Sequence, residues 1–263
     1  MNNTDANQLF KKIENSKAVD FGDIFTKSIE LFKKVWVQGF VHLLITFAAA
    51  IPLLLIIYIP LFAMLGMEGL ENDFDGSPHP IEELSIGFLI LFVLLVIVVM
   101  IGMMMLQFAV TAHFYRVCYQ VDMEEPGNSG YFMFFNKQYF VKTFVLSISM
   151  VGISLLAILL CVFPLYYVMV PMQLLWVIFA FNPDLSASDL IKASFKYGNK
   201  IWLIAFGLIF ISSMLAQFAG LILCYVGLFF TASFARIPVY FLYKDGLGFE
   251  SEDSLDEKEL FIE

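Results

Sequence analysis

Charged residues are scarce in this sequence. Of its 263 residues, 15% are Asp, Glu, Lys or Arg, whereas 60% are hydrophobic. Soluble domains carry about 25% charged and about 45–50% apolar residues. The shortage of charge, together with a mean hydropathy of +0.82, excludes an ordinary soluble domain and predicts an integral membrane protein.

Basic residues are the rarer of the two charge types. Fifteen Lys and Arg stand against 24 Asp and Glu, which gives a formal net charge of −9. Proteins that bind nucleic acid need a basic surface to neutralise phosphates. The balance therefore excludes nucleic acid as a partner and leaves membrane lipids, anionic ones included, as the expected partners.

Cysteine is limited to three residues, Cys118, Cys161 and Cys224, all in or beside apolar runs. They show no Cys-x-x-Cys spacing and their number is odd. Disulfide frameworks and zinc sites use paired, regularly spaced cysteines. The three are therefore expected to be small buried hydrophobic residues.

Histidine is equally rare, and the known catalytic motifs are missing. His42, His79 and His113 lie far apart in the sequence, whereas a membrane metal centre needs several imidazoles on adjacent helical turns. The acidic stretch "ENDFDG" lacks the closing glutamate of a calcium loop. No phosphate-binding loop, nucleophile elbow or His-Glu-x-x-His occurs. The sequence predicts no catalytic residue, no metal, no cofactor and no enzymatic activity.

Long apolar runs are what the sequence does contain. A helix crosses the hydrocarbon layer in about 20 residues, and the runs 143–183 and 201–243 are about twice that length. Each is expected to form two helices joined by a turn, near Pro164 and near Gly220. The sequence thus predicts an all-α, polytopic fold with six transmembrane helices over 37–64, 86–112, 143–163, 165–182, 201–218 and 221–243.

The distribution of basic residues fixes the expected orientation. With six spans, every Lys or Arg segment falls on one side, and the acidic 65–85 loop and both tight turns fall on the other. Cytoplasmic segments are rich in Lys and Arg. Both termini are therefore predicted to be cytoplasmic in a bacterial inner membrane. Residues 1–20 read as a cytoplasmic segment without the apolar core of a signal peptide, 21–245 as the membrane domain, and 246–263 as an acidic disordered tail.

Amphipathic segments precede several of the predicted spans. From Asp23, which is suited to a helix N-terminus, to Trp36, apolar residues recur at helical spacing. The opposite face carries Lys27, Glu30, Lys33 and Lys34. Such a helix is expected to lie along the headgroup boundary, outside the apolar layer. We expect elbow helices of this kind over 23–36, 131–142 and 187–200.

The elbow pattern repeats. "DIFTKSIELFKKVW" begins at Asp23, and "DLIKASFKYGNKIW" begins at Asp189 with identical residues at four of fourteen positions. Both stretches stand directly before an apolar run. A weaker third copy, "YFMFFNKQYFVKTF", begins at Tyr131. The sequence predicts a pseudo-repeated protein made of three two-span units.

These segments, with "HFYRVCYQVD" after the second span and "VYFLYKD" after the last, resemble a bacterial family of six-span integral membrane proteins. This family includes the membrane domain attached to some glycerophosphoryl diester phosphodiesterases and the YciC-like proteins. The resemblance covers about residues 18 to 246. It implies a six-helix fold of unknown function and supplies no catalytic residue, because the family's chemistry belongs to a separate soluble domain.

The candidate binding residues are basic. The lysines of the first and third elbows would contact lipid headgroups, and Trp36 and Trp202 would anchor the elbows at the interface. Arg236 lies about 10 Å inside the end of the last span. It either reaches back to the headgroups or faces the interior near Gln107 or His113, where it could hold an anionic lipid phosphate. The headgroup-binding candidates are Lys27, Lys33, Lys34, Lys192, Lys196, Lys200 and Arg236.

These features support three hypotheses about function. The leading hypothesis is a non-enzymatic membrane scaffold or accessory protein that interacts with lipids through its elbows. The alternative is a transporter or lipid-handling protein with a site near Arg236, suggested by the repeats and by Pro52 and Pro60 inside the first span. An intramembrane enzyme is the weakest hypothesis, because no paired acid, base or nucleophile lies at membrane depth.

Overall fold

The computed structural model describes residues 3–71, 86–125, 133–160, 163–223 and 226–249. The regular elements in these ranges are all helical, which confirms the predicted all-α class. They are α1 (Asn3–Glu14), α2 (Phe21–Glu71), α3 (Ile86–Asp122), η2 (Met133–Phe135), α4 (Lys137–Leu159), α5 (Phe163–Phe181), α6 (Ala187–Lys200), α7 (Trp202–Ile222), α8 (Leu228–Thr231), η3 (Ala232–Arg236) and α9 (Ile237–Leu247). The predicted loop around His79 and the predicted tail 250–263 lie outside the described residues.

Five of these helices, α2, α3, α4, α5 and α7, are long and apolar enough to cross a membrane. The chain therefore has the helices of a membrane protein. The predicted sixth span, 221–243, is instead divided among α8, η3 and α9. The break has a local cause: the N–H of Ile237 bonds to the carbonyl of Phe234 in a tight turn, and Pro238 has no N–H to continue an α-helical ladder.

The first predicted hairpin turn lies where it was expected, and the second does not. The first lies between α4, which ends at Leu159, and α5, which begins beside Pro164, as expected. The second was placed at Gly220, but α7 runs on to Ile222. A Cβ on Gly220 would lie 2.4 Å from a methyl carbon of Leu228. This glycine therefore permits α8 to pack closely on α7 and does not end the helix.

Two of the three predicted elbows are not separate helices. α2 continues through Trp36 without a break because no helix-ending signal separates the amphipathic part from the apolar part. Asp20, rather than the predicted Asp23, caps this end: its carboxylate accepts the N–H of Asp23 at 2.8 Å. The second predicted elbow begins at Tyr131, and residues 131–132 lie outside the described residues. Its later part is not a separate helix, because α4 starts at Lys137 and continues into the apolar segment.

The third elbow is a separate helix, α6. Ser186 caps its start, and it ends at Ile201. Its apolar face does not lie against lipid, because α6 packs along α5. The contact is closest where a Cβ on Gly198 would lie 3.1 Å from the Pro171 ring.

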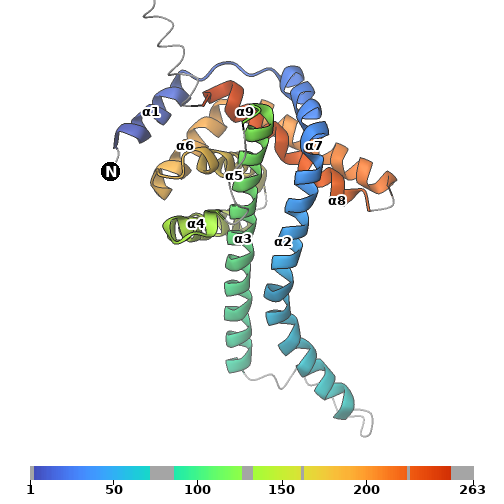
Figure 1. The fold of residues 1–263 in the computed structure, drawn as a ribbon. Helices are drawn as coiled ribbons and strands as arrows, with labels where there is room; N and C mark the ends of the chain where they lie inside the picture. Colours follow the sequence, from blue (N-terminus) through green and yellow to red (C-terminus); the bar gives the residue numbers. More distant parts are fainter. Residues whose placement is uncertain (1–2, 72–85, 126–132, 161–162, 224–225, 250–263) are drawn as a thin grey trace, which may run out of the picture.

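Helices that follow one another in the chain pack together: α2 on α3, α3 on α4, α4 on α5, α5 on α6 and α7 on α8. Figure 1 shows α2 and α3 side by side, with their lower parts extending beyond the other helices. There α2 bends, in the part that contains Pro52 and Pro60. Large apolar side chains on this extension are exposed, Phe62 and Leu91 both by 67%. The main core lies at the other end, where α1, α5, α6 and α9 meet the upper parts of α2 and α3.

Candidate functional site between α2, α3 and the C-terminal segment

Three of the seven residues predicted to bind headgroups instead contact other residues of the protein. Lys27 contacts the carboxylates of Asp23 at 2.7 Å and Asp245 at 2.9 Å. Lys196 contacts Glu14 at 2.6 Å, and Lys200 donates to backbone carbonyls at the end of α1. Their main role in the fold is to join α2 to α9 and α6 to α1.

The Glu14 carboxylate responds to this arrangement. A hydrogen bond from Lys196 and the charge of that lysine lower the pKa of Glu14 below its ordinary value. The same ammonium lies 5.5 Å from the centre of the Phe10 ring. Lys196 is thus held between two residues of α1.

Lys33, Lys34 and Lys192 behave differently. All three are exposed, and none makes an ion pair with the described residues. Lys192 stands on the outer face of α6. Lys33 and Lys34 stand beside a groove at the start of α2.

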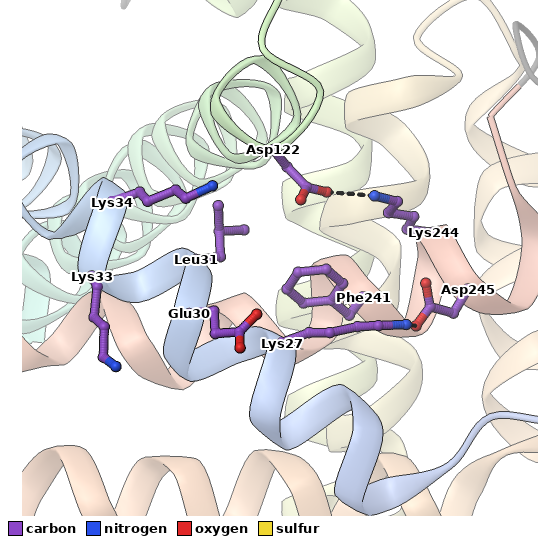
Figure 2. A pocket seen from close by; sticks show the side chains of 9 residues that line it. All are labelled: Lys27, Glu30, Leu31, Lys33, Lys34, Asp122, Phe241, Lys244 and Asp245. Carbon is purple, nitrogen blue, oxygen red and sulfur yellow. Dashed lines mark hydrogen bonds and ion pairs between the residues drawn. The ribbon is translucent and has the colours of Figure 1, made fainter.

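This groove, which we call the basic groove, lies between α2, the end of α3 and α9 (Figure 2). Its volume is about 460 Å³. Four lysines and three carboxylates line it, so its formal charge is +1. Leu31 and Phe241 supply apolar wall. Its lining residues are Lys27, Glu30, Leu31, Lys33, Lys34, Asp122, Phe241, Lys244 and Asp245.

Ion pairs set the shape of the groove. Asp122 at the end of α3 contacts Lys244 at 2.7 Å and accepts the hydroxyl of Tyr240 at 2.7 Å. Together with the Lys27–Asp245 pair, this contact neutralises two of the four lysines. Figure 2 shows Lys34 reaching toward the side of the groove that carries Asp122, while Lys33 points away from it. The positive charge that is not paired therefore comes from Lys33 and Lys34.

The predicted anchors Trp36 and Trp202 lie in different settings. Trp36 is 42% exposed, with its ring centre 6.0 Å from that of Phe230. Trp202 stacks on Phe206 and donates its indole N–H to the carbonyl of Tyr167 at 3.1 Å. Trp36 thus keeps more of its ring at the surface, where a membrane interface would receive it.

Deeper in the protein, α2, α3 and η3 meet at a second polar region. His42 of α2 and His113 of α3 are 2% and 1% exposed. Nε2 of His42 lies 2.7 Å from Nδ1 of His113, and the two rings are stacked with centres 5.0 Å apart. We call this contact the histidine pair.

Its hydrogen bonds define the proton positions. Nδ1 of His42 lies 2.9 Å from the carbonyl oxygen of Gln38. Because a carbonyl only accepts, Nδ1 of His42 carries a proton. In neutral His42 the Nε2 atom is then an acceptor, and Nδ1 of His113 donates to it. Both rings are fixed in orientation and neither contributes negative charge.

Arg236 is the last residue of η3, and its side chain is half-buried. The two predicted positions of Arg236, at the headgroups or facing the interior near His113, stay predictions; Gln107 bonds to Thr111. Ser233, one tight turn before Arg236, packs so closely on α2 that a Cβ on Gly39 would lie 2.3 Å from its hydroxyl.

The histidine pair was missed from the sequence because the histidines are 71 positions apart. One signal pointed to it: Lys34, Gln38, His42 and Thr46 recur every four residues, which marks a polar stripe on an apolar helix. Among the described residues, no three His, Cys, Asp or Glu side chains form a group that could hold a metal ion. Cys118 is buried and unpaired, as predicted; Cys161 and Cys224 lie outside the described residues.

Comparison with known proteins adds no relative to this description. No family model matches the sequence, no curated protein matches it, and no solved structure matches it. The resemblance to the six-span bacterial family therefore stays a prediction, and the function must be argued from the two polar regions.

Proposed function

We propose that this protein is a non-enzymatic, multi-pass membrane protein that binds anionic lipid headgroups in the basic groove and acts there as a scaffold or accessory protein. The observation that carries the proposal is the pairing within the groove. Two lysines are neutralised by carboxylates, and Lys33 and Lys34 are left without an ionic partner among the described residues.

The walls of the groove also suit a lipid. Phe241 and Leu31 give an apolar surface beside the charged rim. A headgroup with acyl chains can use both, since its phosphate meets ammonium groups while its glycerol and first methylenes meet apolar side chains. A free anion would use only the rim.

We further propose six apolar segments that enter a bacterial inner membrane as three hairpins, with both termini cytoplasmic. The support is the distribution of Lys and Arg, which places every basic segment on one side. In this arrangement the basic groove lies at the cytoplasmic headgroup layer, where anionic lipids are exposed to it.

The test replaces both unpaired lysines. In nanodiscs that contain phosphatidylglycerol and phosphatidylcholine, Lys33→Gln with Lys34→Gln should lower the retention of phosphatidylglycerol about thirtyfold, because each lysine near the surface contributes about 1 kcal/mol. Native mass spectrometry of the released protein counts the bound lipids. Raising the salt concentration should weaken binding by the parent protein.

The matched control is Lys11→Gln with Lys17→Gln, which removes the same charge from exposed positions outside the groove. This control should bind phosphatidylglycerol like the parent. Equal lipid retention by the groove variant, the control and the parent would contradict the proposal.

A second candidate function, transport or lipid handling at a site near Arg236, is favoured by one observation. Arg236 makes no ion pair with the described residues. Arg236 is not among the residues that line the basic groove.

A further inference from the structure

The lower part of α3 is covered on one side only. Its large apolar side chains between Ile86 and Met100 are exposed on every side of the helix except the side that faces α2. Val99, which is 4% exposed, marks that side, as does Gly102, where a Cβ would lie 3.6 Å from a methyl carbon of Leu53. No other described helix therefore runs beside this part of α3. The exposed residues are Ile86, Leu89, Ile90, Leu91, Val93, Leu94, Ile97, Val98 and Met100.

α4 begins at the upper edge of this part and does not follow α3 downward. Phe135, directly before α4, packs against the cluster of Ala50, Leu106 and Val110. α4 has 23 residues, or a length of about 35 Å. Directed along the lower part of α3, it would cover the side chains that are exposed there. Figure 1 instead shows α4 at one level of the α2–α3 pair, beside the middle of α3, so α4 lies across the pair.

The two faces of α4 differ in polarity. Its buried face includes the hydroxyl groups of Thr143 and Ser147. On the opposite face, every exposed residue from Phe140 to Leu159 is apolar, and no charged residue follows Lys142 in the helix. A continuous apolar surface of this kind needs lipid or a protein partner to cover it. The exposed residues are Phe140, Val141, Phe144, Val145, Ile148, Leu155, Leu156, Ile158 and Leu159.

α5 packs on α4 and on a charged helix. α6 runs back along α5 as far as Tyr167, whose hydroxyl donates to Asn199 at 2.5 Å. Charged side chains at membrane depth face the interior of a bundle or water, but Lys192 is exposed on the outer face of α6. α6 therefore lies outside the hydrocarbon layer, and α5, which it follows over most of its length, does not cross that layer. The charged residues of α6 are Asp189, Lys192, Lys196 and Lys200.

We propose that the α4–α5 hairpin does not cross the bilayer and that α4 lies parallel to the membrane plane, with its exposed face against acyl chains of the leaflet next to the termini. Helices with one apolar face lie in this way at the boundary between headgroups and acyl chains. The occupant of the α4 face is lipid because that face is continuous with the apolar surface of the α2–α3 pair.

The inference rests on the proposed arrangement of the six apolar segments and narrows it. A hairpin that crosses twice and a hairpin that does not cross both leave the termini on the same side of the membrane. Lipid binding in the basic groove is a separate property, because no residue of α4 or α5 lines that groove.

The depth of spin labels along α4 tests the proposal. Single cysteines replace Val141, Ile148 and Leu155, which are seven residues apart on the exposed face, in protein whose own three cysteines are changed to Ala. Each cysteine is spin-labelled in nanodiscs. The accessibility of each label to oxygen and to a water-soluble nickel complex measures its depth. The three depths should agree within about 5 Å, whereas a crossing helix would move each label by about 10 Å relative to the next.

The matched control uses the same spacing on α3. Labels at Ile86, Val93 and Met100, also exposed, should differ in depth by about 10 Å for at least one of the steps, as expected for a helix that crosses. Labels at Phe144 and Leu156 repeat the measurement on α4 if a first variant does not keep the elution volume of the parent. A spread of depths along α4 equal to that along α3 would overturn the proposal.

A second measurement concerns the turn between α4 and α5. Leu160→Cys should not react with a membrane-impermeant maleimide added outside intact cells, because the turn stays in the leaflet next to the termini. Ser77→Cys, between α2 and α3 in the sequence, should react. Reaction of Leu160→Cys from outside would contradict the proposal. The count of lipids bound in the basic groove would be unaffected, so the two proposals fail separately.

Discussion

At the scale of single residues, positions without side chains decide where the polar regions form. Gly39 allows η3 to approach α2 so closely that Ser233 occupies the space of a side chain. Gly220 does the same for Leu228. Glycine in a helix costs about 1 kcal/mol relative to alanine, and here the close packing of two helices offsets that cost.

Gly39→Ala is expected to destabilise the protein. The added Cβ would meet Ser233 Cβ at 2.4 Å as well as its hydroxyl, and overpacking of this kind costs about 1 to 3 kcal/mol. The gain in helix propensity recovers only part of that. Thermal unfolding followed by tryptophan fluorescence in detergent measures the change.

A second substitution provides the control. Ser233→Gly removes both clashing atoms, so Gly39→Ala with Ser233→Gly should unfold at a higher temperature than Gly39→Ala alone. Gly152→Ala, where nothing lies within 4 Å of the new Cβ, should not lower the unfolding temperature. If Gly39→Ala were as stable as Gly152→Ala, the close contact between η3 and α2 would be wrong.

At the scale of elements, α6 connects α1 to the core of the protein. On its inner side Tyr197 donates a hydrogen bond to the carbonyl of Leu242 in α9 at 2.5 Å, and burial raises the pKa of that hydroxyl. On its outer side Lys196 and Lys200 hold the end of α1. Cations at a helix C-terminus bond the last carbonyls and favour its dipole.

The contact between α1 and α6 should therefore depend on pH. Because the folded pKa of Glu14 lies below its ordinary value, its contribution is present above about pH 4.5 and is lost as the pH falls through the lowered pKa. Distances between spin labels at Asn7 and Lys192 should be narrowly distributed at about pH 7 and broader at about pH 3.

Glu14→Gln removes the titrating group. Its distance distribution should be broader than that of the parent at neutral pH and should change less on acidification. An equally sharp response to pH in Glu14→Gln would show that another group controls the docking of α1.

At the scale of the whole molecule, the apolar surface is concentrated away from the basic groove. The extension of α2 and α3 and the exposed sides of α4 and α7 carry most of the exposed large apolar residues. Contiguous apolar surface of this extent requires lipid or a protein partner. The groove and the exposed lysines lie at the opposite end of α2.

Single-tryptophan variants test this division. Trp36, 42% exposed, should be quenched by brominated lipids more strongly than Trp176, which packs against the main core. The other two tryptophans are replaced by Phe in each variant, and Trp202→Phe alone serves as the control for folding. Stronger quenching of Trp176 than of Trp36 would contradict the packing of α5 in the core.

The sequence predicts the class of the fold, but it does not predict where several helices begin and end. Length and hydropathy predict α2, α3, α4, α5 and α7 because a membrane helix satisfies its own backbone. The continuation of α2 through Trp36 and the division of the last segment at Pro238 depend on packing, which no local pattern contains. Because α6 packs on α5, Lys196 and Lys200 contact α1 and were not expected to do so from the sequence.

The polar regions were predictable in part. The exposed lysines Lys33 and Lys34 follow from charge beside an apolar run. The histidine pair does not, because it requires the register between α2 and α3. Sequence spacing fixes positions along one helix, but it does not fix how far one helix slides against the next.

Because α2 is one continuous helix, a change of its angle at one end displaces its other end. From Lys34 to Glu71 it spans 37 residues, or about 55 Å along its axis. A tilt of about 5° at the groove would displace the far end sideways by about 5 Å. A sideways displacement of the exposed end of α2 would thus reach the basic groove as a change of angle.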